Sequence, residues 1–261
     1  MKKSINIENK LIPVIFQILL LLMWQFIVDK GNIPKYILPS PKDIIISLFN
    51  ILPEIRIHIY TTLREALIGF AISIIIAIIL VILMDTYKIV KKCFYPILVV
   101  SQTIPVITLA PLFMIWFGFG IAPKVIAVVL VCFFPIVISL MDGLESVDKD
   151  IINLLRGMGA SKFHIFKYVK FPGSIISFFS GLRIAATYSI MGAIIGEWLG
   201  GDAGLGVYMI RVKHSYALDK VFACILIIIL LSMALFGLIY LLQNILTPWA
   251  KQNKIYGGKN E

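Results

Sequence analysis

Residues 142–173 read DGLESVDKDIINLLRGMGASKFHIFKYVKFPG, and this polar stretch between two apolar runs decides how the chain is organised. Its first half carries apolar side chains at helical spacing, with charged side chains on the other face. The apolar positions are Leu144, Val147, Ile151, Leu154, Leu155 and Met158, and the charged ones are Asp148, Asp150 and Arg156. Gly157 and Gly159 are suited to end that helix. The first half therefore predicts one short amphipathic helix.

The second half of the stretch predicts another short helix. Ser161 is placed to cap it, and Pro172 is expected to stop it. Between them, Phe163, Phe166 and Val169 oppose a basic face formed by Lys162, His164, Lys167 and Lys170. Two amphipathic helices joined by a glycine hinge present an apolar ridge, and a groove on a partner protein would bury it.

The composition of the whole chain indicates a membrane protein. Of the 261 residues, 60% are hydrophobic and 15% are charged, and the mean hydropathy is +0.97. A soluble domain of this size cannot bury so much apolar surface. The three cysteines have apolar neighbours and no metal-type spacing, so we expect neither a disulfide framework nor a metal site.

Charge-free apolar runs predict six transmembrane helices, since about 20 apolar residues are needed to cross a bilayer. We expect spans at 11–28, 66–84, about 95–116, 125–141, 174–199 and 221–250. The first run is too long for a signal peptide and lacks a small-residue cleavage site, so we expect it to stay as an anchor. Prolines in 95–116 predict kinks. The fold class is thus an all-α membrane protein with six spans.

The net charge of +10 follows from the same topology. With an even number of spans, both termini lie on one side, and most Lys and Arg residues of the connecting segments then fall on that side. The positive-inside rule therefore predicts cytoplasmic termini in a multi-pass protein of the cell membrane. The lipid bilayer accounts for the basic excess, and no nucleic-acid partner is expected.

Residues 29–60 predict an amphipathic helix on the outer surface, interrupted near Pro53. Its polar positions are Asp43, Ser47, Asn50, Glu54 and His58. Packing over neighbouring spans with no further role is an alternative reading of this helix. We divide the chain into an N-terminal anchor and outer helix at 1–56, a transmembrane domain at 57–245 and a cytoplasmic tail at 246–261.

Several of these segments resemble the permease subunits of ABC importers with the type I fold. In that family the cytoplasmic loop carries Glu-Ala-Ala, then Gly, then a Pro at fixed separation. Here Gly159 and Pro172 match, whereas Asn153-Leu154-Leu155 replaces Glu-Ala-Ala. The nitrate, sulfonate and taurine branch is further matched by Leu38-Pro39-Ser40-Pro41, Leu109-Ala110-Pro111-Leu112, Gly181-Leu182-Arg183-Ile184-Ala185, Gly196-Glu197 and Gly204-Leu205-Gly206.

The resemblance implies an importer permease that pairs with a second copy of itself. Two ATP-binding-cassette ATPase subunits would attach to the cytoplasmic loop, and an extracytoplasmic solute-binding protein would deliver the substrate. The coupling residues would be Asn153, Leu154, Leu155, Gly159, Ala160, Ser161, Phe163, Phe166 and Pro172. The chain has no phosphate-cradling Gly-rich loop, so ATP and Mg²⁺ would be bound by the partner ATPase and no cofactor by this chain.

Other positions are candidates for the pathway and its gate. Arg183, Thr187, Ser189 and Glu197 lie in one span and are candidate pathway residues. Arg183 can instead extend to the inner surface, the hydroxyls can instead join helices, and Glu197 can instead be an interfacial structural carboxylate. Gly204, Leu205 and Gly206 form a candidate external gate, although a plain turn explains the glycines equally well.

The sequence leaves the transported solute open among sulfonates, taurine, nitrate and thiamine-precursor pyrimidines. An ion-gradient-driven secondary transporter is the alternative function, although we expect no acidic residue at the span centres. A membrane enzyme is disfavoured because the three histidines are scattered and no catalytic arrangement is apparent.

Overall fold

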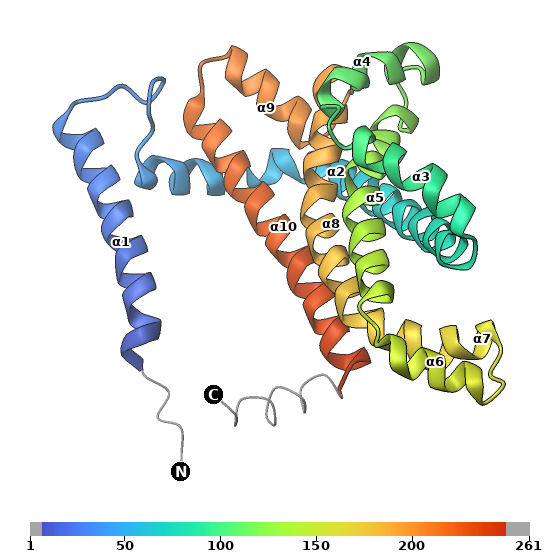
Figure 1. Ribbon diagram of the computed structural model, residues 1–261. Coiled ribbons are helices and arrows are strands. Elements are labelled where there is room, and N and C mark those ends of the chain that lie inside the picture. Colours follow the sequence, from blue (N-terminus) through green and yellow to red (C-terminus); the bar gives the residue numbers. More distant parts are fainter. Residues whose placement is uncertain (1–6, 249–261) are drawn as a thin grey trace.

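The computed structural model describes residues 7–248, with side chains from Leu11 onward, and the described part of the chain is helical (Figure 1). Five helices are long and apolar enough to cross a membrane. They are α1 (Ile7–Lys30), α2 (Pro41–Thr86), α5 (Ala122–Glu145), α8 (Phe171–Leu199) and α10 (Leu218–Leu246). These five helices confirm the spans predicted around 11–28, 66–84, 125–141, 174–199 and 221–250. The tail predicted at 246–261 lies outside the described residues except for its first three.

The span predicted at about 95–116 is not one continuous helix, but the two helices that form it are together apolar and long enough to count as a sixth span, and the predicted kink is present as a sharp bend. Two helices, α3 (Lys88–Ser101) and α4 (Val106–Phe117), take its place and meet at an angle of 102°. Pro105, which has no N–H to donate, stands immediately before α4, and the chain turns at residues 102–104. The prolines within the two helices, Pro96 and Pro111, do not break them.

The predicted interruption near Pro53 is also wrong, since α2 runs through Pro53 as one helix of 46 residues. Its start is fixed by a capping box, in which Ser40 and Asp43 each accept a hydrogen bond from the other's backbone N–H. On either side of Pro53, Ile51 and Ile55 are fully buried against residues of the last two helices of the fold. This packing holds the helix together where a proline would weaken an isolated one.

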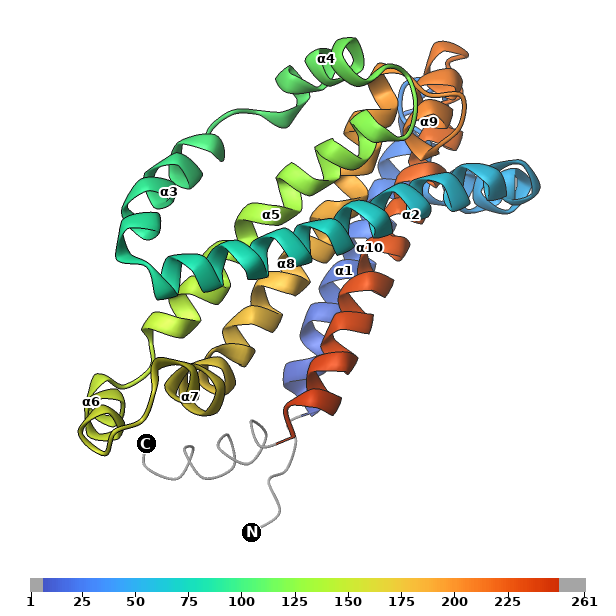
Figure 2. The same ribbon diagram turned by 90° about the vertical axis from the view of Figure 1, so that its right-hand side faces the viewer.

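The centre of the fold is the packing of α8 against α5, with α2 crossing both (Figure 2). Small residues bring these helices together: a Cβ atom at Gly181 would lie 2.7 Å from the carbonyl oxygen of Pro135, and one at Gly192 would lie 2.9 Å from the Cα of Val128. Close backbone approach of this kind is typical of helices that associate within a membrane.

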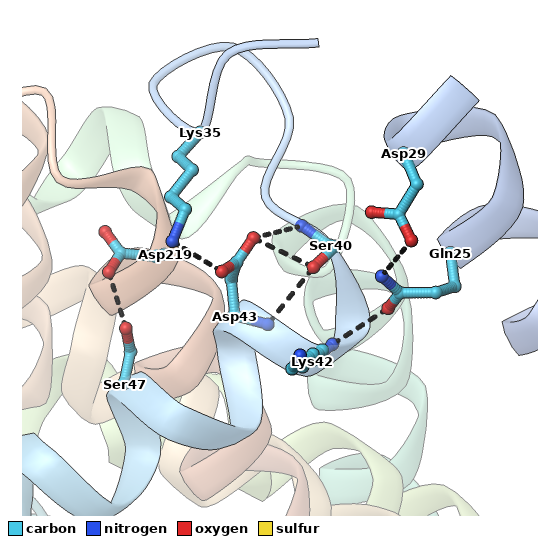
Figure 3. Close-up of polar contacts among 8 residues, drawn as sticks. All are labelled: Gln25, Asp29, Lys35, Ser40, Lys42, Asp43, Ser47 and Asp219. Atoms are coloured by element: carbon cyan, nitrogen blue, oxygen red, sulfur yellow. Dashed lines mark hydrogen bonds and ion pairs between the residues drawn. The ribbon is translucent and has the colours of Figure 1, made fainter. Parts of the chain in front are cut away.

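Helix α1 touches the rest of the fold mainly near its end. Most of its side chains are exposed, but Trp24 packs on Phe222 of α10 with ring centroids 5.9 Å apart. At the same end, Gln25 Oε1 accepts a hydrogen bond from the backbone N–H of Lys42 at 3.1 Å (Figure 3). The anchor is therefore attached where the chain enters α2.

Polar contacts also join the start of α2 to the start of α10 (Figure 3). The Lys35 ammonium lies 2.6 Å from Asp43, and this contact raises the pKa of Lys35 above its usual value. The Ser47 hydroxyl donates to the carboxylate of Asp219 at the start of α10. Ser47 is buried, so the polar side of the predicted outer helix does not all face solvent.

The two ends of the bundle differ in what they present (Figures 1 and 2). The start of α1, the end of α10 and the short helices α6 (Lys149–Gly157) and α7 (Lys162–Ile165) lie at one end. Helix α4 and helix α9 (Leu205–His214) lie at the other. The described ends of the chain thus share a side with the loop at 142–173, as the even span number predicts.

Candidate functional site

Two short helices, α6 and α7, form the loop at 142–173, as the sequence predicts. The Asp148 carboxylate caps α6 by accepting a hydrogen bond from the backbone N–H of Asp150 at 2.8 Å. Helix α6 ends at Gly157, and Gly159 follows with a φ of 85°, in the region that favours glycine. The Ser161 hydroxyl then caps α7, accepting from the backbone N–H of His164 at 3.3 Å.

The prediction that Pro172 stops the second helix is wrong. A π-helical segment, η1 (Phe166–Lys170), continues α7 directly into α8. Pro172 lies in the first turn of α8, where its missing N–H costs least. The second half of the loop is therefore a continuous extension of a core span.

Two side chains of the loop are buried, and sequence periodicity did not single out either of them. Ile152 and Ile165 are 8% and 3% exposed. Phe166 packs on Phe171 with ring centroids 6.1 Å apart, and the Lys170 ammonium lies 2.6 Å from Asp85 at the end of α2. The loop is thus fixed to both α2 and α8.

The outward side of the loop is apolar. Four large apolar side chains, which we call the apolar loop residues, are solvent-exposed: Ile151, Leu154, Met158 and Phe163. Leu154 and Phe163 are 66% and 67% exposed. Of the other predicted coupling residues, Asn153, Gly159, Ser161 and Pro172 are exposed, whereas Leu155, Ala160 and Phe166 are half-buried.

At the opposite end, three successive backbone N–H groups are held by buried side chains of α2 and α8. Gly204 donates to His58 Nδ1 at 3.0 Å, Leu205 donates to Thr62 Oγ1 at 2.8 Å, and Gly206 donates to Glu197 Oε2 at 2.6 Å. The Thr62 hydroxyl in turn donates to Glu197 Oε1 at 2.6 Å. We call His58, Thr62, Glu197 and residues 204–206 the outer latch.

In the outer latch, a predicted pathway residue is hydrogen-bonded to the predicted gate loop, although the two were predicted separately. Glu197, predicted as a pathway residue or a structural carboxylate, is 1% exposed and is bonded to the predicted gate loop. The sequence pointed to neither Thr62 nor His58 as a partner, because both lie more than 130 residues before the groups that they bind.

A buried ion pair lies beside the outer latch and was not predicted either. The ammonium of Lys124, at the start of α5, is 3.0 Å from Glu65 of α2, and both side chains are almost fully buried. A Cβ atom at Gly201 would lie 2.9 Å from the Lys124 ammonium, so this pair also contacts the gate loop. Both charges flank predicted spans, where each by itself resembles an ordinary interfacial charge.

The remaining predicted pathway residues of α8 bond to protein groups. The Arg183 guanidinium donates to Gln243 Oε1 of α10 and, at 3.0 Å, to Ser180 Oγ. Thr187 and Ser189 donate to carbonyls of their own helix, those of Ile184 and Ala186. The structure therefore brings Glu197 to the gate loop, whereas Arg183 is directed to α10.

These features define a multi-pass helical membrane protein with an anchored apolar loop at one end and a hydrogen-bonded loop, residues 204–206, at the other. Residues 69–251 match the family described as binding-protein-dependent transport system inner membrane component. The chain belongs to this family and is a permease of an ABC transporter. The predicted ABC importer permease is therefore confirmed over the alternative of an ion-gradient-driven secondary transporter.

Curated relatives agree with this assignment. The chain is 40% identical over 241 residues to the formylaminopyrimidine transport permease protein of Halalkalibacterium halodurans, covering 92% of this chain and 96% of that protein. It is 31% identical to the riboflavin transport system permease protein of Chloroflexus aurantiacus, over 88% of this chain and 87% of that protein. Permeases for aliphatic sulfonates and taurine match at lower identity, which confirms the predicted branch.

A solved structure of an amino acid ABC transporter shares the fold. Its TM-score to this chain is 0.62 with 16% sequence identity, and the match covers 76% of this chain and 97% of that one. This likeness confirms the predicted permease fold.

Proposed function

We propose that this chain is one of two identical permease subunits of an importer whose ATPases dock on the apolar loop residues. The observation that carries this assignment is the combination of exposed apolar side chains with attachment of the same loop to α2 through Lys170 and to α8 through Phe166. An exposed apolar surface at the end of a rigid element is suited to insertion into a groove of a partner. ATP and Mg²⁺ belong to that partner, and this chain binds no cofactor.

The loop and both termini face the cytoplasm in this proposal. The loop carries exposed basic side chains, including Arg156, Lys162 and Lys167, which favour the cytoplasmic side of a membrane. The outer latch then faces the exterior. An extracytoplasmic solute-binding protein would release its solute above residues 204–206, and opening of the latch would admit the solute to the pathway.

The solute that we propose is a small nitrogen heterocycle of the pyrimidine class. The 40% identical relative is a formylaminopyrimidine permease, whereas the taurine permease of Escherichia coli is 26% identical. Binding of a sulfonate within the membrane would also require an available cation. The one basic side chain inside α8, Arg183, is already bonded to Gln243 and Ser180.

The docking proposal is tested with Leu154→Asp and Phe163→Asp in the full-length permease, co-expressed with the ATP-binding-cassette ATPase of the transporter. Both side chains are exposed, so the substitutions remove no internal packing, and we expect permease yield and melting temperature to be unchanged. Co-purification of the ATPase should be lost. The matched control is Tyr36→Asp in the segment before α2, where an aromatic side chain is 58% exposed. Normal co-purification with both loop variants would refute the docking site.

A further inference from the structure

A pocket of about 300 Å³ opens beside the break between α3 and α4. One wall comes from the break itself, with Ser101, Gln102 and Ile104, and the other from the middle of α5 and α8. Non-helical backbone in a membrane is tolerated only where it is buried in protein or lines a cavity. The pocket therefore lies where the 102° bend leaves non-helical backbone between α3 and α4.

The lining of the pocket is aromatic and uncharged. Phe133 and Phe134 of α5 and Tyr188 of α8 contribute three rings, and no Asp, Glu, Lys or Arg side chain lines the pocket. Among the described residues, neither the Gln102 amide nor the Tyr188 hydroxyl has a hydrogen-bond partner in the protein. Aromatic rings offer stacking surfaces, and the free amide and hydroxyl can both donate and accept hydrogen bonds.

Arg183, the basic side chain of α8, does not line this pocket. Arg183 is five residues before Tyr188, which on an α-helix places the two side chains about 140° apart around the axis. Its guanidinium bonds to α10 and lies 6.0 Å from the ring centroid of Phe236 on that helix. An anion in the pocket would gain no countercharge from the lining side chains, which disfavours it relative to a neutral solute within a membrane.

We propose that this pocket is a solute station of the permease, and that it selects an uncharged single-ring nitrogen heterocycle over an organic anion. The ring stacks on Tyr188 and the Phe133–Phe134 pair, and Gln102 bonds to the ring nitrogen and amino groups. A volume of about 300 Å³ is at the lower limit of small-molecule pockets, roughly 300–1,000 Å³, which favours one ring over a fused three-ring system. This inference rests on the proposed function and adds a site and its selectivity.

The test measures binding to the full-length permease in lipid nanodiscs by ligand-detected NMR, which is suited to weak sites. The probes are the neutral 4-amino-5-hydroxymethyl-2-methylpyrimidine and the anionic ethanesulfonate. We expect saturable binding of the pyrimidine and none of ethanesulfonate. Tyr188→Ala and Gln102→Ala should weaken pyrimidine binding roughly 5-fold to 100-fold, as removal of a stacking or hydrogen-bonding partner does. Tyr188→Phe, which keeps the ring, should retain most of the binding.

Tyr240→Ala is the matched control, because this tyrosine is half-exposed on α10 and does not line the pocket. The proposal is overturned if ethanesulfonate binds as tightly as the pyrimidine, if the pocket variants bind like wild type, or if no pyrimidine binds. Uptake of the pyrimidine by cells expressing the complete transporter is measured in parallel. Uptake without binding at this pocket would leave the proposed function standing and refute only the station, whereas pocket binding without uptake or ATPase association would refute the proposed function alone.

Discussion

The hydroxyl of Thr62 links the main chain of Leu205 to the carboxylate of Glu197. It accepts a hydrogen bond from the Leu205 N–H at 2.8 Å and donates one to Glu197 Oε1 at 2.6 Å. All three residues are almost fully buried, so water cannot replace either partner. One side chain of α2 thereby joins the outer loop to α8, and this arrangement makes the latch sensitive to single substitutions.

Replacement of Thr62 by Ala should destabilise the permease. The change leaves a buried N–H and a buried carboxylate oxygen without their partner, which costs about 1–3 kcal/mol. The apparent melting temperature in detergent should fall, and Thr61→Ala is the matched control because the adjacent hydroxyl bonds only to its own helix, at the surface. Equal melting temperatures for the two variants would contradict the role of Thr62.

Gly204→Ala should disrupt the outer loop while leaving the bundle folded. Gly204 has a φ of 133°, and a Cβ atom there would collide with the Glu197 carboxylate. Forcing a side chain into this conformation costs roughly 1–3 kcal/mol. We expect faster proteolysis of the loop at 200–206 and reduced uptake. Gly237→Ala in α10, where a Cβ atom meets only open space, should preserve both properties; similar behaviour of the two variants would argue against a latch.

Gly159→Ala should impair coupling of ATP hydrolysis to uptake. A Cβ atom at Gly159 and one at Gly157 both meet open space, so the two sites differ in backbone conformation alone. Gly159 has a φ of 85°, which costs an alanine about 1–2 kcal/mol, whereas Gly157 is the last residue of α6.

The measurement for this pair is the stimulation of ATPase activity by solute-loaded binding protein in the assembled transporter. We expect a lower stimulation in Gly159→Ala and a normal or slightly more stable transporter in Gly157→Ala. A transporter with Gly159→Ala that is stimulated like wild type would show that the hinge geometry is dispensable.

Arg183→Gln and Gln243→Ala should have the same effect, because each removes the same contact between α8 and α10. We expect each to lower stability by about 0.5–2 kcal/mol, with the double variant little worse than either single variant. If Arg183 instead neutralises an anionic solute, Arg183→Gln should abolish uptake while Gln243→Ala leaves it intact. Uptake assays on the two variants distinguish these outcomes.

Sequence alone was sufficient for the features that depend on local composition. The length of an apolar run predicts a membrane-crossing helix because each residue adds a fixed rise, and five runs became helices of that kind. The caps of the loop at 142–173 were equally predictable: Ser161 bonds to a backbone group three residues away, and Gly159 takes the backbone conformation that glycine favours.

Only the tertiary structure decided the features that depend on contacts between distant segments. Helix α2 continues through Pro53 because Ile51 and Ile55 are packed on both sides of it, whereas the chain turns before Pro105 and then begins a second helix. A proline weakens a helix in either place, and the surrounding packing determines whether the helix survives.

The same distinction applies to the candidate sites. Thr187, Tyr188 and Ser189 are adjacent hydroxyl residues in the sequence, yet only Tyr188 lines the pocket, since the rotation of α8 is set by its packing on α5. Glu197 was identifiable as a carboxylate in an apolar span, but its bonds to Thr62 and Gly206 were not. Composition thus determined which segments enter the membrane. Helix packing determined which side chains contact one another there, because a buried polar group without a partner costs free energy.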